Sequence, residues 1–268
     1  KPLRFLKDIK QLDLSGYDVV ICDYEPITAW AARQQNKKTI GISHQYAFQY
    51  HIPRAGTDPV SEAVMRNFAP VDIGIGLHWH HFDQPILPPV IETPIIAQQI
   101  QRNKVVIYLP FEDQQQVMKL LSPFKEFEFF IYSPENVTSP YAHIHCKPLS
   151  LHGFQKDLSD CTGIICNAGF ELASESLQLG KKILVKPVHA QMEQTSNAAA
   201  LQLLGYGKMM HSVDAKIIEQ WLYESKAIQV TYPNTAKYPV QWIKDGMPPI
   251  DPSRCRQRWS EVKVIPVD

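Results

Sequence analysis

The sequence has no surplus of charge of either sign and no long hydrophobic run. Its 268 residues include 27 lysines and arginines against 27 aspartates and glutamates, so the formal net charge is zero. Proteins that bind nucleic acids usually carry a basic surplus, so this balance argues against that class of function. No window approaches ~18 uninterrupted apolar residues, the length that a membrane-spanning helix needs. With 44% apolar and 20% charged residues, the composition indicates a globular protein and not a disordered one.

The sequence also lacks a signal peptide and a disulfide framework. Its first residues, KPLRFLKD, contain neither an apolar core nor a cleavage site. The five cysteines form an odd count without paired spacing. Cys22 and Cys166 lie inside apolar runs, where a thiol packs as a small hydrophobic group. These features predict a reduced, cytoplasmic protein.

The length predicts two domains, because a domain usually has about 100 to 200 residues. Short apolar runs alternate with helix-like segments, which is typical of parallel sheets covered by helices. The predicted strands are Val19–Cys22, Thr39–Ile42, Ile73–Leu77, Val105–Leu109, Phe127–Tyr132, Gly163–Cys166 and Ile183–Lys186. The predicted helices are Thr28–Gln35, Gln114–Leu121, Glu171–Leu179, Met192–Leu204 and Ala215–Glu224. The proline-rich stretch Gln84–Pro94 predicts a linker, with one domain over residues 1–89 and a second over 90–268 that includes a C-terminal tail.

The stretch that follows the predicted strand Gly163–Cys166 carries the most chemical information. This strand leads into Asn167-Ala168-Gly169, and a helix begins at about Phe170. Glycine lets a ligand approach the backbone closely. The N–H groups at a helix start, together with the helix dipole, form an anion site that suits phosphate.

Polar side chains on this helix and in a later loop extend the predicted site. Glu171 and Glu175 lie four residues apart on one face of the helix. A carboxylate there can accept hydrogen bonds from the two hydroxyls of a ribose, or both are solvated glutamates that the helix dipole favours. The loop after the strand Ile183–Lys186 concentrates hydrogen-bonding groups that suit a sugar or simply cap the next helix: His189, Gln191, Glu193 and Gln194.

The order of these residues resembles a known family. Gly169 followed by Ser174-Glu175, Leu179-Gly180, an apolar strand, Pro187, Glu193-Gln194 and Asn197-Ala198 is similar to the nucleotide-sugar domain of GT-B glycosyltransferases. The resemblance extends to the lipid II-forming N-acetylglucosaminyltransferases, and most of all to a group of bacterial and archaeal glycosyltransferase-like proteins. The stretches 18–26 and 41–45 resemble the second half of their N-terminal domain. The resemblance implies an α/β protein of two Rossmann-like domains with parallel sheets.

The resemblance also implies roles for individual residues. Backbone N–H groups of Asn167, Ala168 and Gly169, at the helix start before Phe170, would hold the diphosphate. Glu175 would hold the ribose hydroxyls, and Glu193 and Gln194 would contact the donor sugar, with His189 nearby. The sequence departs from the family at Leu109-Pro110-Phe111-Glu112, where a glycine- or serine-rich turn usually contacts phosphate. Proline offers no N–H there and glutamate repels an anion.

The catalytic base and a metal site are less well defined. His44, Asp23 and Glu25 follow predicted strands of the first domain and are alternative bases, while Glu25 before Pro26 also fits a helix N-cap. The histidines of His78-Trp79-His80-His81-Phe82-Asp83 and of His143-Ile144-His145-Cys146 could suggest a metal. They also fit polar loops, and the resemblance implies no metal and no cofactor.

The resemblance implies a hexosyltransferase that is independent of metal and moves a sugar from a nucleotide-diphosphate sugar, UDP-linked by expectation, to an acceptor hydroxyl. The acceptor would be a glycan or lipid-linked glycan, with peripheral contact at the inner membrane surface. The alternatives are a nucleotide-sugar hydrolase or epimerase and a fragment that binds nucleotide sugar without turnover. The family's opening strand and glycine-rich loop have no counterpart, and the chain begins at Lys1, so we expect the first domain to lack its start.

Overall fold

The computed structural model describes residues 2–92 and 96–267. The chain forms two compact units. The N-terminal unit contains Lys1–Ile52, Thr57–Val90 and Pro233–Glu261, and the C-terminal unit contains Pro53–Gly56, Ile91–Tyr232 and Val262–Asp268. Thr93 and Pro94 of the predicted linker lie outside the described residues. In the described part of the chain, no helix is both long and apolar enough to cross a membrane.

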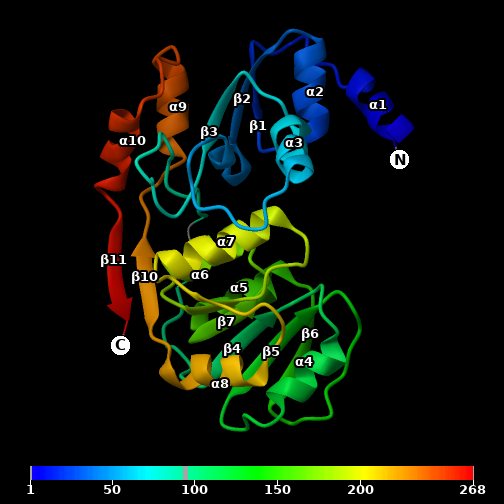
Figure 1. The fold of residues 1–268 in the computed structure, drawn as a ribbon, viewed down its shortest axis with the longest axis vertical. Helices are drawn as coiled ribbons and strands as arrows, with labels where there is room; N and C mark the ends of the chain where they lie inside the picture. Colours follow the sequence, from blue (N-terminus) through cyan, green and yellow to red (C-terminus); the bar gives the residue numbers. More distant parts are fainter. Residues whose placement is uncertain (1, 93–95, 268) are drawn as a thin grey trace. The chain divides into compact units, whose positions relative to one another are not determined.

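The C-terminal unit is built on a six-stranded parallel sheet with the order β6-β5-β4-β7-β8-β9 (Figure 1). Its strands are β4 (Lys104–Tyr108), β5 (Glu128–Ser133), β6 (Ile144–Pro148), β7 (Gly163–Cys166), β8 (Lys182–Val185) and β9 (Lys208–Met209). All four residues of β7 are buried. An apolar strand of this kind suits the middle of a sheet that helices cover on both faces.

Helices cover both faces of this sheet (Figure 1). They are α4 (Gln114–Leu121), α5 (Leu151–Asp160), α6 (Phe170–Gln178), α7 (Met192–Leu203) and α8 (Ala215–Glu224). On one face α4 and α8 pack against the strands, with Met118 and Trp221 among the buried residues of one core cluster. The helices α5, α6 and α7 lie on the other face (Figure 1). This is the doubly wound arrangement, in which ligands bind at the carboxyl ends of the strands.

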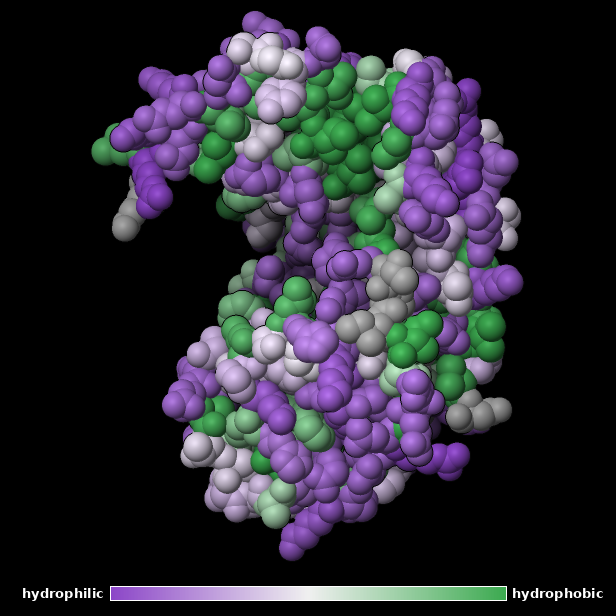
Figure 2. All heavy atoms as spheres, turned by 180° about the vertical axis from the view of Figure 1, so that it is seen from behind, coloured by the Kyte–Doolittle hydropathy of each residue, from purple (hydrophilic) through white to green (hydrophobic). Residues whose placement is uncertain are grey.

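The N-terminal unit contains a three-stranded parallel sheet with the order β1-β2-β3. Its strands are β1 (Val19–Cys22), β2 (Lys38–Ser43) and β3 (Ile73–Gly76), and its first helices are α1 (Pro2–Gln11), α2 (Pro26–Gln34), the 3₁₀ helix η1 (His44–Gln49) and α3 (Pro59–Phe68). Hydrophobic side chains gather over part of this unit on the face drawn in Figure 2, while the C-terminal unit is mostly hydrophilic there. Exposed apolar residues of the unit include Ile21, Val60 and Val64.

The predicted domain division needs a correction at the end of the chain. The break after Val90 lies one residue from the predicted one, but residues 233–261 belong to the N-terminal unit. They form α9 (Lys237–Lys244) and α10 (Pro252–Trp259), and the Trp259 indole N–H donates to the carbonyl of Ile86 at 2.7 Å. The chain then returns, because β11 (Lys263–Val267) pairs antiparallel with β10 (Ala227–Thr231). Pro53–Gly56 joins the C-terminal unit, where Ala55 and Ser196 exchange hydrogen bonds.

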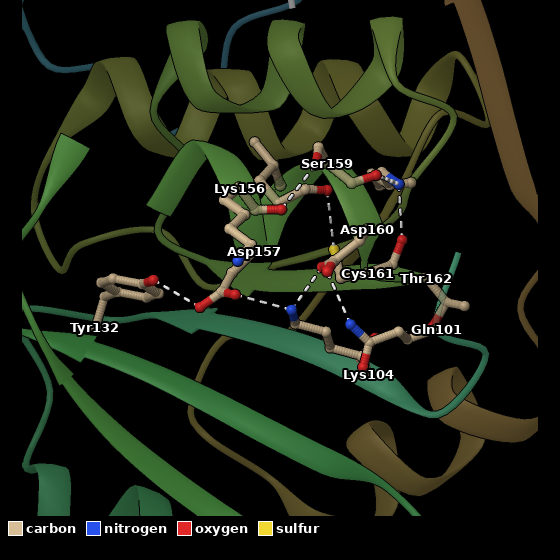
Figure 3. A network of polar contacts seen from close by, with 11 residues as sticks. Gln101, Lys104, Tyr132, Lys156, Asp157, Ser159, Asp160, Cys161 and Thr162 are labelled. Atoms are coloured by element: carbon tan, nitrogen blue, oxygen red, sulfur yellow. Dashed lines mark hydrogen bonds and ion pairs between the residues drawn. The ribbon is translucent and has the colours of Figure 1, made fainter. Parts of the chain in front are cut away.

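A buried ionic network holds the end of α5 to the start of β4 (Figure 3). The Lys104 ammonium lies 2.8 Å from a carboxylate oxygen of Asp157 and 2.5 Å from one of Asp160. The Tyr132 hydroxyl donates to Asp157 at 2.6 Å, and the Gln101 side-chain amide donates to Asp160 at 2.8 Å. The Lys104 side chain is only 3% exposed, so these partners compensate a charge that would otherwise be costly to bury.

Candidate functional site

Three neighbouring strands of the C-terminal unit, β4, β7 and β8, end side by side and carry the predicted site. The Asn167 N–H, just after β7, donates to the carbonyl of Tyr108 at the end of β4. The Lys186 N–H, just after β8, donates to the carbonyl of Cys166. The predicted strand, turn and helix after Gly163 are therefore present, and α6 begins at Phe170 as expected.

Side-chain amides fix the turn between β7 and α6. The Asn167 amide donates to the carbonyl of Lys186 at 2.8 Å, and the Asn197 amide donates to the carbonyl of Ala168 at 3.0 Å. Asn197 is fully buried on α7, and Ser174 is fully buried on α6, where its hydroxyl donates to the carbonyl of Phe170. Asn197 therefore holds the turn in shape, whereas the hydrogen bond of Ser174 lies within α6.

The helices α6 and α7 begin without a hydrogen bond from an N-cap side chain. Their N-cap residues are Gly169 and Gln191. By contrast, the side chains of Asp113, Ser150 and Asp214 accept hydrogen bonds from the first N–H groups of α4, α5 and α8. The N-cap side chains of α6 and α7 therefore do not compensate the helix dipoles, although each first turn carries one glutamate, Glu171 and Glu193.

The backbone at the turn offers fewer N–H groups than the sequence predicted. The Asn167 N–H bonds to Tyr108, and the Gly169 N–H bonds to the Asn167 carbonyl at 2.9 Å. Of the three predicted donors, only the Ala168 N–H is left outside these contacts. A methyl group on Gly169 would meet no atom within 4 Å, and its φ of −70° suits any residue. The protein's own packing therefore does not require glycine here.

The two glutamates on α6 lie in different surroundings. Glu171 is exposed, whereas Glu175 is half-buried one turn further along. Burial raises the pKa of the Glu175 carboxyl, and the nearby charge of Glu92 raises it further. The exposed position of Glu171 matches the solvated alternative, and Glu175 keeps the environment of a binding residue.

The loop before α7 is closed by one of the predicted sugar-binding residues. The Val188 N–H donates to the side-chain oxygen of Gln194 at 2.9 Å, and Gln194 is 9% exposed. The oxygen of this amide therefore shapes the loop. His189 and Gln191 are exposed and Glu193 is half-buried, so the loop carries polar groups at different depths.

One feature of the site was not foreseen from the sequence. Glu112, in the turn after β4, forms an ion pair with Lys186, whose ammonium lies 2.5 Å from its carboxylate. The side chains are 17% and 12% exposed. The expected repulsion between Glu112 and an anion is therefore compensated by a cation. The signal that could have revealed it is Lys186 itself, the only lysine or arginine in the turns that follow β4, β7 and β8.

The three candidate bases of the N-terminal unit differ in accessibility. His44 is 2% exposed, its Nδ1 lies 2.9 Å from the carbonyl of Leu77, and its ring packs against Phe48 and His78. This burial and these contacts favour a packing role for His44, and its role as a base stays a prediction. Glu25 caps α2: desolvation raises its pKa, but hydrogen bonds from Thr28 and Ile27 outweigh this and lower it.

Asp23 directly follows β1 and is exposed, and partial desolvation raises its pKa. Of the three candidates, only Asp23 combines an exposed side chain with a raised pKa.

The histidine-rich stretches do not assemble a metal centre in the described residues, where no group of three histidine, cysteine, aspartate or glutamate side chains could hold an ion. His78 is 1% exposed and accepts a hydrogen bond from the Trp79 N–H. Burial and the neighbouring His44 and His80 hold the pKa of His78 well below its usual value. The Nε2 atom of His145, on β6, lies 2.6 Å from a carboxylate oxygen of Glu128, on β5.

Comparisons with known proteins support the fold. The chain is similar to MurG of Acinetobacter baumannii, with a TM-score of 0.55 and 15% identity over 91% of this chain and 79% of that one. It is also similar to the glycotransferase of kitacinnamycin, with a TM-score of 0.54 and 13% identity over 82% of this chain and 72% of that one. A third similar structure is CalG4, the calicheamicin glycosyltransferase, with a TM-score of 0.53 and 10% identity over 94% of this chain and 75% of that one. No curated protein sequence matches the chain. The model of glycosyl transferase family 1 matches residues 4–225. The chain therefore belongs to glycosyl transferase family 1 and has the GT-B fold.

Proposed function

We propose that the C-terminal unit binds a nucleotide-diphosphate sugar, with UDP as the nucleotide, and that the protein transfers this sugar to an acceptor hydroxyl. The observation that carries the proposal is that α6 and α7, which follow neighbouring strands, both begin at the carboxyl edge of the sheet without a side-chain cap. Two helix starts at the ends of neighbouring strands would favour a ligand with more than one negative charge. A diphosphate fits this requirement.

The surrounding side chains suit the rest of such a donor. We assign the diphosphate to the first turn of α6 and the ribose hydroxyls to the Glu175 carboxylate. We assign the sugar to Glu193 and to the NH₂ group of Gln194. The side-chain oxygen of Gln194 already accepts a hydrogen bond from the Val188 N–H. His189 and Gln191 are exposed in the same loop and offer further contacts to the sugar.

The reaction we propose breaks the bond between the anomeric carbon and the diphosphate oxygen and forms a bond from that carbon to the acceptor oxygen. The proton of the acceptor hydroxyl passes to a base, for which Asp23 is the candidate. Negative charge develops on the departing diphosphate, and the α6 dipole stabilises it without a metal. We propose a glycan or a lipid-linked glycan on the cytoplasmic side as the acceptor.

The test is incubation with a panel of nucleotide sugars, with and without glycan and lipid-linked acceptors, followed by measurement of released nucleotide and glycosylated product. Release that requires acceptor supports transfer, whereas release without acceptor indicates a hydrolase. Binding without release indicates a protein that only binds nucleotide sugar. A titration with UDP on the wild type, Glu175→Ala and Glu219→Ala comes first. Glu219 is an exposed glutamate on α8 and is the control. The proposal fails if no nucleoside diphosphate binds and Glu175→Ala changes nothing.

A further inference from the structure

The ion pair between Glu112 and Lys186 lies across the carboxyl end of β7. Glu112 follows β4 and Lys186 follows β8, and β7 lies between these two strands in the sheet. A contact between their side chains therefore joins the two strands that flank β7. The Asn167 amide also donates to the Lys186 carbonyl, so Lys186 lies close to the turn that leads into α6.

The charges around this position make the ammonium important. The turns after β4, β7 and β8, together with the first two turns of α6 and the first turn of α7, carry five carboxylates: Glu112, Asp113, Glu171, Glu175 and Glu193. Lys186 is the only lysine or arginine in the same segments. A diphosphate that binds here adds further negative charge, so it needs a cation as well as the helix dipoles. A lysine ammonium on its flexible stem binds phosphate as a point charge.

Two buried amides beside the pair have acceptor atoms without partners. Asn167, which holds the Lys186 carbonyl, is 7% exposed, and Gln114, which donates to the Glu112 carbonyl at 2.8 Å, is 3% exposed. The side-chain oxygens of both amides are buried and have no hydrogen-bond partner within residues 2–92 and 96–267. A buried acceptor without a donor costs free energy. Because both amides also contact the backbone of the pair, the surroundings of Glu112 and Lys186 are polar.

We propose that Lys186 binds the diphosphate of the donor and that Glu112 is the counter-ion which Lys186 exchanges for it. The proposal rests on the proposed function of the site. In the free protein the Glu112 carboxylate forms an ion pair with the Lys186 ammonium, and in the complex a phosphate oxygen replaces the carboxylate in this pair. No covalent bond changes in this exchange. Glu112 therefore competes with the ligand for one cation, and it lowers the affinity of the site for nucleotides that cannot displace it.

The experiment measures the binding of UDP and of inorganic pyrophosphate by calorimetry to five proteins. They are the wild type, Lys186→Met, Glu112→Gln, the double variant, and the control Lys182→Met. Lys182 is a half-buried lysine at the opposite end of β8, where its ammonium donates to the carbonyl of Leu222. Thermal unfolding of each protein verifies that it is folded.

We expect Lys186→Met to weaken UDP binding about tenfold or more, since it removes a charge-assisted hydrogen bond, and to weaken pyrophosphate binding similarly. Glu112→Gln should strengthen both, the double variant should lose that gain, and Lys182→Met should match the wild type. Unchanged UDP binding in folded Lys186→Met would overturn this inference and leave the proposed function standing. So would a gain from Glu112→Gln that persists without Lys186. A wild type that binds no nucleoside diphosphate would overturn both.

Discussion

The substitution Gly169→Ala separates a requirement of the ligand from a requirement of the fold. A methyl group at this position would meet no atom of the protein within 4 Å, and the backbone φ of −70° is open to alanine. The free energy of unfolding should therefore change little. Alanine is a poorer N-cap than glycine by roughly 0.5 to 1 kcal/mol, whereas the loss of freedom in the unfolded chain stabilises by roughly 0.4 to 1 kcal/mol. The two effects nearly cancel.

The effect of Gly169→Ala on binding should be much larger. The added methyl group occupies the space beside the first turn of α6, where the proposed diphosphate approaches the backbone. If it displaces one charge-assisted hydrogen bond, the loss is about 1.5 to 3 kcal/mol. A loss of this size weakens binding by roughly ten- to a hundredfold.

The assay for this substitution combines thermal unfolding with titration of UDP. Gly16→Ala is the matched control, because a methyl group at Gly16 also meets nothing within 4 Å but lies in the N-terminal unit. We expect both variants to unfold within a few degrees of the wild type, and only Gly169→Ala to lose UDP affinity. Wild-type UDP affinity in a folded Gly169→Ala protein would refute the assignment of the diphosphate to this turn.

Three further substitutions test the fold and the electrostatics. Lys104→Met leaves two half-buried aspartates without their cation and should lower the unfolding free energy by about 3 kcal/mol; an unchanged midpoint in urea would contradict this. Gly163→Ala would place its methyl 2.8 Å from the buried Trp221 ring and should cost about 1 to 3 kcal/mol, measured in the same way. Burial raises the pKa of Glu175 above its ordinary value of 4.5. The folded protein then holds this proton more tightly than the unfolded chain, so the contribution of Glu175 to stability falls as pH rises from the unfolded pKa through the folded one. The ionised form binds ribose hydroxyls, so UDP affinity should fall as pH drops through the raised pKa, and Glu175→Gln should flatten this profile.

Much of the C-terminal sheet could be predicted because local signals agree there. The strand β7 and the helices α4 and α8 have the predicted bounds. The two helices begin after Asp113 and Asp214, which accept hydrogen bonds from their first turns. A buried apolar strand or a capped amphipathic helix contains its own signal in the sequence.

The elements that were missed depend on contacts that a local pattern does not contain. The edge strand β6 is half-exposed along most of its length, so it lacks an apolar run. The helices α9 and α10 have eight residues each, and α9 contains Pro239. They are held by distant contacts such as the Trp259 indole on Ile86. Tertiary packing decides such segments more than propensity does.

At the site, the sequence indicated which residues gather but not which bonds they make. The turn, α6 and the loop before α7 lie where they were predicted. Two hydrogen bonds could not be predicted because they depend on the folded backbone. The Val188 N–H donates to the Gln194 side-chain oxygen, and the Gly169 N–H donates to the Asn167 carbonyl. The pair of Glu112 and Lys186 joins residues 74 positions apart. Its existence follows from the order of the strands, in which β4 and β8 flank β7.

Two ion-paired lysines at opposite ends of this sheet, the buried Lys104 and the half-buried Lys186, differ in what their partners allow. Lys104 begins β4 and lies between two aspartates, which are themselves bonded to Tyr132 and Gln101 (Figure 3). To move its ammonium would leave two carboxylates uncompensated, so this lysine is fixed and its contribution is to stability. Lys186 has one carboxylate partner in the described structure, beside an uncapped helix start. A phosphate can replace a single carboxylate because it restores the same charge. The number of partners therefore explains why one lysine anchors the sheet and the other is suited to exchange its partner for a ligand.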